Sequence, residues 1–170
     1  MRFLMRYWPL RAWWVFWLGL KNESPRRRPT EMEDGVWVGG VPLPRRWRVL
    51  QAAGVTRVVT LLGEASPAPW LRSAESLLWL PVPDNHAPTM EQLRRGCAFL
   101  DSARSSDGPA TLISCGAGIG RASTLYLAWR MATGTPLERA LDALRRRRPV
   151  VSPTRRQLDC LHQWGDELRG

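Results

Sequence analysis

Residues 114–124 combine a cysteine, glycines and an arginine at a spacing that suits phosphate chemistry. Their sequence is SCGAGIGRAST, and the apolar stretches on either side predict a strand before the segment and a helix after it. A loop that enters a helix presents unpaired backbone N–H groups and the positive end of the helix dipole. Glycine lets such a loop curl so that several N–H groups point inward. The segment is therefore expected to hold a tetrahedral oxyanion.

Two side chains of this loop could perform covalent chemistry on a bound phosphate. The thiolate of Cys115 is expected to be stabilised by the inward N–H groups, the helix dipole and Arg121, and to act as a nucleophile. Arg121 can also bind two phosphate oxygens at once and follow them into the transition state. The phosphate would be bound by the backbone of Gly116, Ala117, Gly118, Ile119 and Gly120.

The leaving group of a phosphomonoester also needs a proton donor. The best candidate for this general acid is Asp84, in the loop 82–89 (VPDNHAPT) that follows an expected strand. Because the carboxyl ends of parallel strands share one edge of a sheet, Asp84 is expected to lie near the glycine loop. The alternative interpretation of Asp84 is a turn residue or a helix cap.

Other loop types and metal sites do not fit the residue pattern. A dinucleotide-binding GxGxxG loop would need glycine at the position of Arg121, and a Walker loop needs Gly-Lys-Ser/Thr. The three cysteines are too widely spaced for a zinc site or a disulfide framework, which favours a reducing, cytosolic compartment. We expect no metal ion and no cofactor. Cys97 is expected in the core, and neither Cys160 nor His162 is expected to have a functional role.

The elements around the loop alternate between strands and helices from residue 35 onward. Strands are expected within 35–42 and at 55–62, 76–82 and 109–113, and helices within 44–54, 89–104, 121–133, 135–148 and 152–168. This alternation predicts the α/β class, with a central, mostly parallel sheet flanked by helices. Thr89 and Gln92 predict a capping box, Gly54 a C-terminal cap, and Thr135 the N-cap of a helix with Pro136 at its first position.

The net charge of +10 favours anionic partners such as phosphorylated substrates, membrane lipid or nucleic acid. Nucleic acid is the weakest of these, because the arginine run 145–148 has no interleaved aromatic residues for base stacking. The run is instead expected at the end of a helix, where cations suit the dipole and Pro149 stops the helix. We expect no nucleic-acid partner.

The N-terminal residues 1–20 are unusually rich in tryptophan and arginine, and their longest apolar run covers only residues 12–20. About 20 apolar residues are needed to span a bilayer, whereas mixed aromatic and basic residues suit its headgroup region. We predict peripheral attachment of residues 1–20 to an anionic membrane from the cytoplasmic side, a linker at 21–34 and a catalytic domain at 35–170. An arm folded onto the domain's own core, or a spanning or signal segment, remains the alternative.

The Cys115-x5-Arg121 pattern resembles the signature of the cysteine-dependent dual-specificity and protein tyrosine phosphatases. The resemblance covers most of residues 35–168, and its overall arrangement is most similar to the branch that contains phosphatidylglycerophosphate phosphatase. It implies the dual-specificity phosphatase fold and phosphomonoester hydrolysis through a phosphocysteine. It further implies that Cys115 is the nucleophile, that Arg121 binds phosphate and that Asp84 acts as acid and then base.

Two positions depart from the usual family pattern. Ser114 stands where the family has histidine, and Ala122 stands where it has serine or threonine. Both changes predict a slow enzyme that is limited at hydrolysis of the phosphocysteine. The small, uncharged loop side chains favour a simple phosphomonoester, on a protein residue or on a phospholipid headgroup. The alternative function is a non-catalytic phosphate-binding module.

Overall fold

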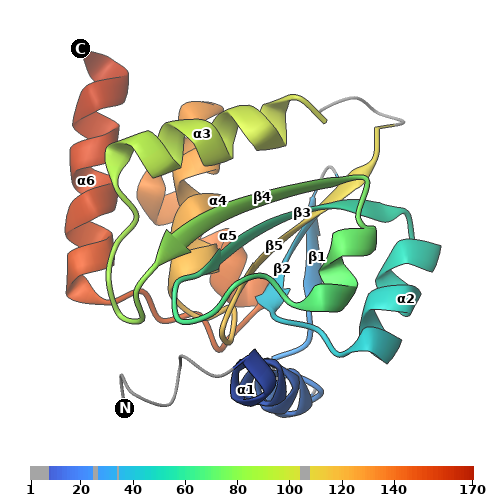
Figure 1. Ribbon diagram of the computed structural model, residues 1–170. Helices are drawn as coiled ribbons and strands as arrows, with labels where there is room; N and C mark the ends of the chain where they lie inside the picture. Colours follow the sequence, from blue (N-terminus) through green and yellow to red (C-terminus); the bar gives the residue numbers. More distant parts are fainter. Residues whose placement is uncertain (1–7, 25–26, 34, 104–107) are drawn as a thin grey trace.

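The computed structural model describes residues 8–24, 27–33, 35–103 and 108–170, and it has an α/β architecture (Figure 1). The described residues form a five-stranded sheet in the order β1-β2-β5-β3-β4. Its strands are β1 (Thr30–Glu33), β2 (Val36–Gly40), β3 (Val55–Leu62), β4 (Ser76–Val82) and β5 (Ala110–Cys115). The helices are α1 (Trp8–Lys21), α2 (Pro44–Ala52), the 3-10 helix η2 (Pro69–Ser73), α3 (Met90–Asp101), α4 (Arg121–Ala132), α5 (Leu137–Arg147) and α6 (Arg155–Arg169).

The sheet is mostly parallel, as the alternation predicted. Strands β2, β5, β3 and β4 run parallel, and only β1 pairs antiparallel, with β2. Strand β5 lies in the middle, between β2 and β3, and nearly all of its residues are buried because helices cover both faces. The loop after β5 therefore emerges at the centre of the carboxyl edge, where α/β sheets bind their ligands.

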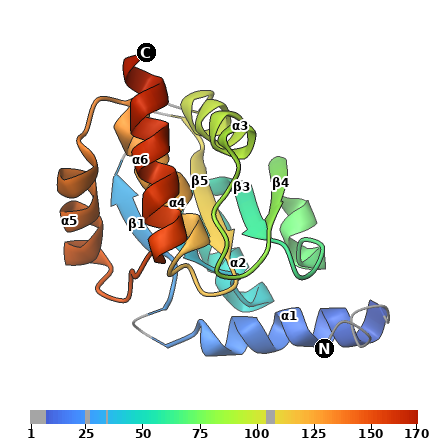
Figure 2. The same cartoon turned by 90° about the vertical axis from the view of Figure 1, so that its left-hand side faces the viewer.

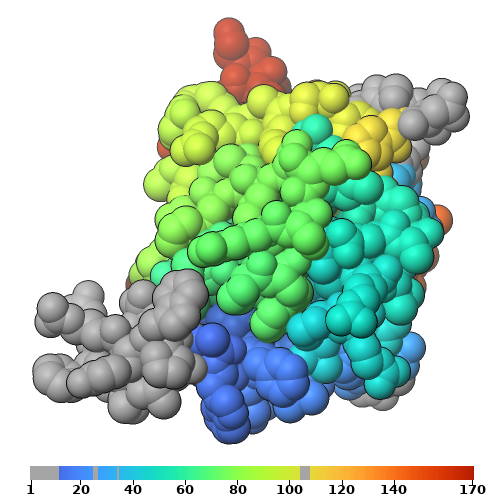
Figure 3. Space-filling model, turned by 45° about the vertical axis from the view of Figure 1, so that its right-hand side comes forward, coloured from blue at the N-terminus to red at the C-terminus, as the bar shows by residue number. Residues whose placement is uncertain are grey.

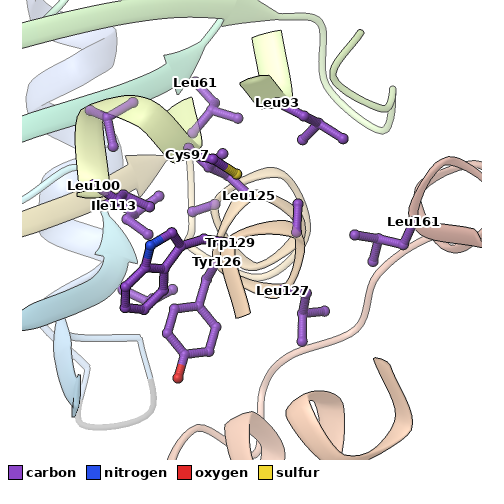
Figure 4. Close-up of a cluster of buried hydrophobic side chains, with 14 of the residues drawn as sticks. Leu61, Leu93, Cys97, Leu100, Ile113, Leu125, Tyr126, Leu127, Trp129 and Leu161 are labelled. Carbon is purple, nitrogen blue, oxygen red and sulfur yellow. The ribbon is translucent and has the colours of Figure 1, made fainter. Parts of the chain in front are cut away.

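Helix α4 is the centre of the larger core, which lies on one face of the sheet. Residues 121–129 of α4 are all buried, because α3, α5 and α6 surround the helix on its outer sides. Leu125, Tyr126 and Trp129 of α4 lie among side chains from the sheet and from α3, including Cys97 (Figure 4). This packing fixes the helix whose first residue is Arg121.

Two of the three helix caps predicted from the sequence are confirmed. Thr89 and Gln92 form the expected capping box of α3, and Gly54 follows α2 with a φ of +88°. The prediction of Thr135 as a cap was wrong. Its hydroxyl accepts a hydrogen bond from the Arg130 guanidinium, and Pro136, with a ψ of 145°, is the residue that precedes the first turn of α5.

Helix α1 lies across the carboxyl end of the sheet (Figure 2). On its inner side Val15 is buried, with Trp14 and Leu18 packed against the smaller core formed with α2 and η2. The opposite side has four exposed apolar side chains at helical spacing: Trp13, Phe16, Trp17 and Leu20. We call these four residues the outer face of α1. The first seven residues of the predicted segment 1–20 lie outside the described residues.

The predicted linker contains regular structure, since residues 30–33 form β1. Of the helices that the structure describes, none has the length and hydropathy required to cross a membrane.

Both edge strands of the sheet are irregular. Strand β4 contains Pro81, and the side chain of Gln92 donates a hydrogen bond to the Pro81 carbonyl. Strand β1 has only four residues, and its register shifts between Glu31 and Glu33. The Arg147 guanidinium donates a hydrogen bond to the Glu31 carbonyl.

Candidate active site

A pocket of about 220 Å³ at the carboxyl edge of the sheet brings the three predicted catalytic side chains together. Its lining comprises Asp84, Asn85, Cys115, Ala117, Ile119, Gly120, Arg121, Ser152, Thr154 and Gln157. The lining comes from the loop after β4, the loop between β5 and α4, and the segment that leads into α6. The sequence therefore identified the two loops that approach each other, and it missed the contribution of the segment before α6.

The loop between β5 and α4 curls around the sulfur of Cys115. The Gly118 amide donates a hydrogen bond to Cys115 Sγ over 3.2 Å. Gly118 has a φ of +68°, and a Cβ atom there would lie 2.2 Å from the carbonyl carbon of Gly39. Only glycine fits this position, because both its backbone conformation and the close approach of β2 exclude a side chain.

The carbonyl groups of this loop all have hydrogen-bond donors from outside the loop. The donors are Asn22 Nδ2 for Gly116 (2.8 Å), Arg148 Nη2 for Ala117 (3.2 Å), Arg148 Nε for Gly118 (3.1 Å), the Ser152 amide for Ile119 (3.2 Å) and the Thr124 amide for Gly120 (2.8 Å). A peptide group whose carbonyl is held outward directs its N–H to the other side. The N–H groups of residues 117–121 are therefore directed away from these donors, toward the inner side of the loop, as a nest for an oxyanion requires.

Arg148 supports the loop from behind and is fully buried. Besides its bonds to the loop, its guanidinium donates to the carbonyls of Arg27 and Arg28 and to the hydroxyl of Thr30. Burial lowers the pKa of Arg148 to about 10, while the nearby Cys115 sulfur acts in the opposite direction. The side chain is therefore still a cation at neutral pH, and its charge favours an anion in the loop.

The sequence predicted Arg148 only as a residue at a helix end, and this prediction missed its hydrogen bonds to the loop carbonyls. The signal available was its place as the last arginine of the run, directly before Pro149, where the helix could not continue. Its backbone is the C-cap of α5, so the side chain is free to turn back toward the loop.

Arg121 is held by two carboxylates. Its Nη1 atom donates to both carboxylate oxygens of Glu64, at 2.8 and 2.9 Å, and to the Val82 carbonyl at 2.7 Å. Its Nη2 atom lies 3.0 Å from Oδ1 of Asp84. Glu64 was missed by the sequence analysis, although it follows the buried strand β3 at the same sheet edge as Asp84. The guanidinium is thus oriented on one side by Glu64 while its Nη2 side faces the pocket.

Asp84 lies in an exposed turn that is anchored at its far end. Asn85 has a φ of 61°, which makes the chain reverse directly after Asp84. The His86 carbonyl accepts a hydrogen bond of 2.9 Å from Nε2 of Gln157, whose side chain also completes a capping box with Thr154 at the start of α6. The carboxylate of Asp84 therefore reaches the pocket from a loop that α6 holds in place.

The two departures from the family pattern lie beside the pocket and do not line it. The Ser114 hydroxyl is buried without a hydrogen-bond partner, and Ala122 is buried in the core around α4. The hydroxyl of Ser123, one position later, donates to the Gly118 carbonyl over 3.3 Å. Neither serine lines the pocket, and the slow hydrolysis predicted from Ser114 and Ala122 stays a prediction.

The other cysteines lie in the protein core. Burial raises the pKa of Cys97 to about 12 and also raises that of Cys160, whose thiol donates to the Pro88 carbonyl. Both thiols are therefore neutral at physiological pH and poor nucleophiles.

Comparison with known proteins places this architecture among phosphatases. Residues 42–165 match the family model described as Swiss Army Knife protein, DSP-PTPase phosphatase domain. Mouse dual specificity protein phosphatase 12 is 32% identical over 143 residues, which are 77% of this chain and 41% of that protein. The Dictyostelium discoideum MAP kinase phosphatase with leucine-rich repeats protein 3 is 26% identical over 130 residues, 74% of this chain and 14% of that protein. The chain thus spans less than half the length of these curated relatives.

Solved structures agree with the sequence relatives. The structure of Tk-PTP in the active form superimposes with a TM-score of 0.72 at 28% identity, covering 84% of this chain and 98% of that one. PTPMT1 in complex with PI(5)P has a TM-score of 0.74 at 21% identity, covering 83% of this chain and 96% of the other. At this level of identity, the similarity to PTPMT1 shows a shared fold alone.

Proposed function

Because this chain belongs to the DSP-PTPase family of cysteine-dependent phosphatases, we propose that Cys115, Arg121 and Asp84 hydrolyse phosphomonoesters through a phosphocysteine intermediate. The observation that supports these roles best is that all three side chains line one pocket, at the mouth of a loop whose carbonyls are held outward.

The first chemical step transfers the phosphoryl group to the enzyme. The Cys115 sulfur attacks phosphorus as the bond to the ester oxygen breaks, and Asp84 gives its proton to the departing oxygen. Arg121 and the inward N–H groups of residues 116–120 hold the equatorial phosphate oxygens, on which negative charge is spread. In the second step water attacks the phosphocysteine, the Asp84 carboxylate takes one of its protons, and inorganic phosphate leaves with Cys115 again a thiolate.

Substrate binding has to break one of the two ion pairs of Arg121. Asp84 is 66% exposed at its side chain, whereas Glu64 is 17% exposed and accepts two hydrogen bonds from Nη1. The exposed pair is the weaker of the two, since solvent screens it. A phosphate therefore displaces Asp84 from Nη2 and leaves Glu64 in place, which frees the Asp84 carboxyl group to reach the leaving oxygen.

Asp84→Asn is expected to lower kcat by about 10²–10⁴-fold with an alkyl phosphate, because an alkoxide leaving group needs a proton. With an activated aryl phosphate the loss should be much smaller, since that leaving group departs unprotonated. Steady-state phosphate release with both substrates measures the difference. The matched control is Asp142→Asn, the same chemical change at an exposed position of α5. An equal loss with both leaving groups would contradict the role of general acid.

The residues lining the pocket favour a substrate with one phosphate on a polar group. Arg121 is the one cation in the described lining, which otherwise offers hydroxyl and amide groups from Asn85, Ser152, Thr154 and Gln157. We propose a phospholipid phosphomonoester as the substrate, because the outer face of α1 gives the chain a surface suited to a bilayer. PTPMT1, which shares this fold, was solved in complex with PI(5)P, and this agrees with a lipid substrate. A phosphorylated protein residue is the alternative substrate.

Phosphate release from two substrates tests this choice. Phosphatidylglycerophosphate in vesicles is compared with a phosphotyrosine peptide at matched concentrations. Faster turnover of the lipid supports the proposal, and faster turnover of the peptide favours the protein alternative. Release from neither, with phosphate still bound, would point to a binding module.

We propose that residues 1–20 attach the chain to an anionic membrane through the outer face of α1. Three of its four side chains are aromatic, Trp13 is 68% exposed, and the ammonium of Lys21 lies 3.6 Å from the ring centre of Trp17. Aromatic residues beside a cation suit the headgroup region of a bilayer. In Figure 3 the blue atoms of α1 form the surface at the lower edge of the molecule. In this proposal the predicted linker 21–34, which contains β1, joins the membrane helix to the phosphatase domain at 35–170.

The double substitution Trp13→Glu and Trp17→Glu is expected to weaken binding to anionic vesicles about a hundredfold or more, given about 1.5 kcal/mol for each buried apolar side chain. Vesicle sedimentation measures the partition coefficient. Val49→Glu is the control, since Val49 is 56% exposed on α2 and its replacement adds charge away from α1. Unchanged partitioning of the double variant would refute the membrane assignment.

A further inference from the structure

The turn after α1 reaches the floor of the phosphate loop. Asn22, the residue directly after α1, has 2% of its surface exposed, and its side-chain amide contacts the residue that follows Cys115. Resting on the proposed function, we infer that Asn22 is a positioning residue, which holds the Gly116 carbonyl outward and so directs the loop's N–H groups at the phosphate. The catalytic loop is thereby completed by a segment outside the matched phosphatase domain.

Both N–H bonds of the Asn22 amide are used on backbone carbonyls. Nδ2 donates to the Gly116 carbonyl over 2.8 Å and to the Val41 carbonyl over 3.0 Å. Val41 in turn donates its own amide to the Cys115 carbonyl over 2.9 Å. One side-chain amide therefore joins the ends of β2 and β5 on both sides of the nucleophile.

The geometry does not suit a residue that merely anchors α1. The other polar atom of the amide, Oδ1 of Asn22, is buried without a hydrogen-bond partner, which destabilises the fold. An apolar side chain would anchor the helix without that cost. What an apolar side chain cannot do is donate to the two carbonyls.

Strand β2 is shaped to admit this side chain. A Cβ atom on Gly40 would lie 2.2 Å from Nδ2 of Asn22, so glycine at this position leaves the space that the amide occupies. A Cβ atom on Gly39 would likewise lie 2.6 Å from Pro29, farther along the segment that leads to β1. The two consecutive glycines at the end of β2 thus let Asn22 and Pro29 lie close behind the loop.

Of the residues that donate hydrogen bonds to the loop carbonyls, Asn22 lies outside the part of the chain that matches the family model. Arg148, Ser152 and Thr124 lie within residues 42–165, which match the family model, whereas Asn22 precedes that range by 20 residues. The first carbonyl after the nucleophile is therefore bound by a residue that the matched domain does not supply.

The experiment compares three variants of the full chain. Asn22→Ala is expected to raise the Kd for inorganic phosphate about tenfold and to lower kcat/KM for an aryl phosphate by a similar factor, because the freed Gly116 carbonyl can turn toward the anion. Asn22→Asp keeps the shape of the side chain but has no N–H to donate, so it should be at least as impaired. Glu23→Gln removes the 2.9 Å ion pair with Arg46 that anchors the same turn, and should behave as wild type.

Two measurements distinguish an effect on the position of the phosphate loop from a general loss of protein stability. Calorimetry measures the Kd for inorganic phosphate at the loop. This measurement tests the role of Asn22 even if the protein does not hydrolyse phosphomonoesters. The rate of alkylation by iodoacetamide reports on Cys115, because it is the cysteine in the described lining of the pocket, while burial raises the pKa of the other two thiols. Phosphate affinity and alkylation rate at the wild-type level in Asn22→Ala would overturn the inference. So would a loss of equal size in Glu23→Gln, or normal phosphate binding by Asn22→Asp.

Discussion

Cys115→Ser is expected to lower kcat by on the order of a millionfold, the size of loss that follows removal of the nucleophile from a covalent mechanism. A serine hydroxyl is far less acidic than a thiol, so it stays protonated at neutral pH and is a much poorer nucleophile than a thiolate. The Gly118 amide that lies 3.2 Å from Cys115 Sγ can stabilise a thiolate, but it cannot accept a proton from a hydroxyl.

Phosphate release under single-turnover conditions measures this loss. Cys160→Ser is the matched control, because its thiol donates to a carbonyl and a hydroxyl can do the same. Cys115→Ser should still bind inorganic phosphate, since the loop backbone and Arg121 are unchanged. Release that survives in Cys115→Ser would exclude a phosphocysteine, and with it the proposed mechanism.

Arg121→Lys is expected to lower kcat/KM by about a thousandfold, in the range known for arginines that stabilise phosphoryl transfer. A lysine keeps the charge but cannot bind two phosphate oxygens in a plane. It also cannot keep the bonds to Glu64 and Val82 while reaching the phosphate, because those bonds use Nη1 whereas Nη2 points to the Asp84 side, and a lysine has a single nitrogen. The loss should therefore appear both in KM and in kcat.

Initial rates over a range of substrate concentrations separate the two parameters. Arg94→Lys is the control, since Arg94 is half-exposed and pairs with carboxylates on the surface of α3 and α6. A rise in KM with unchanged kcat would mean that Arg121 binds the substrate without stabilising the transition state.

The sequence was sufficient to predict the four parallel strands of the sheet and the loop at its centre, whereas β1 was assigned to a linker. Strand β5, the glycine loop and the start of α4 are contiguous, so the residues that surround Cys115 are local and their spacing is visible in the chain. Asp84 was predictable by one further rule, that the carboxyl ends of parallel strands meet at one edge. Its presence in the pocket agrees with that expectation.

The supports of the loop could not be predicted in this way. Asn22 and Arg148 bind loop carbonyls 94 and 31 residues away from them in the chain, and Glu64 binds an arginine 57 residues away. Their hydrogen bonds run from side chain to backbone or between distant loops, and no periodic pattern marks such contacts. Arg148 was further concealed by its three arginine neighbours, which face outward.

Helix α1 shows why the sequence did not decide between two interpretations of the N-terminal segment. The sequence left open whether residues 1–20 contact a membrane or the domain's own core. A helix has two sides, and in the structure Val15 is buried while Trp13 and Trp17 are exposed. The two alternatives are therefore compatible, because each concerns a different side of the same helix.

The irregular edge strands of the sheet have a consequence for how protein substrates could be recruited. An extended peptide can add to a sheet only along a strand with free, regularly spaced N–H and carbonyl groups. Here β4 has a proline without an N–H and a carbonyl bound by Gln92, while β1 is short, bulged and bound by Arg147. Both edges of the described sheet therefore disfavour β-strand addition, and recognition of a peptide would have to rely more on its side chains.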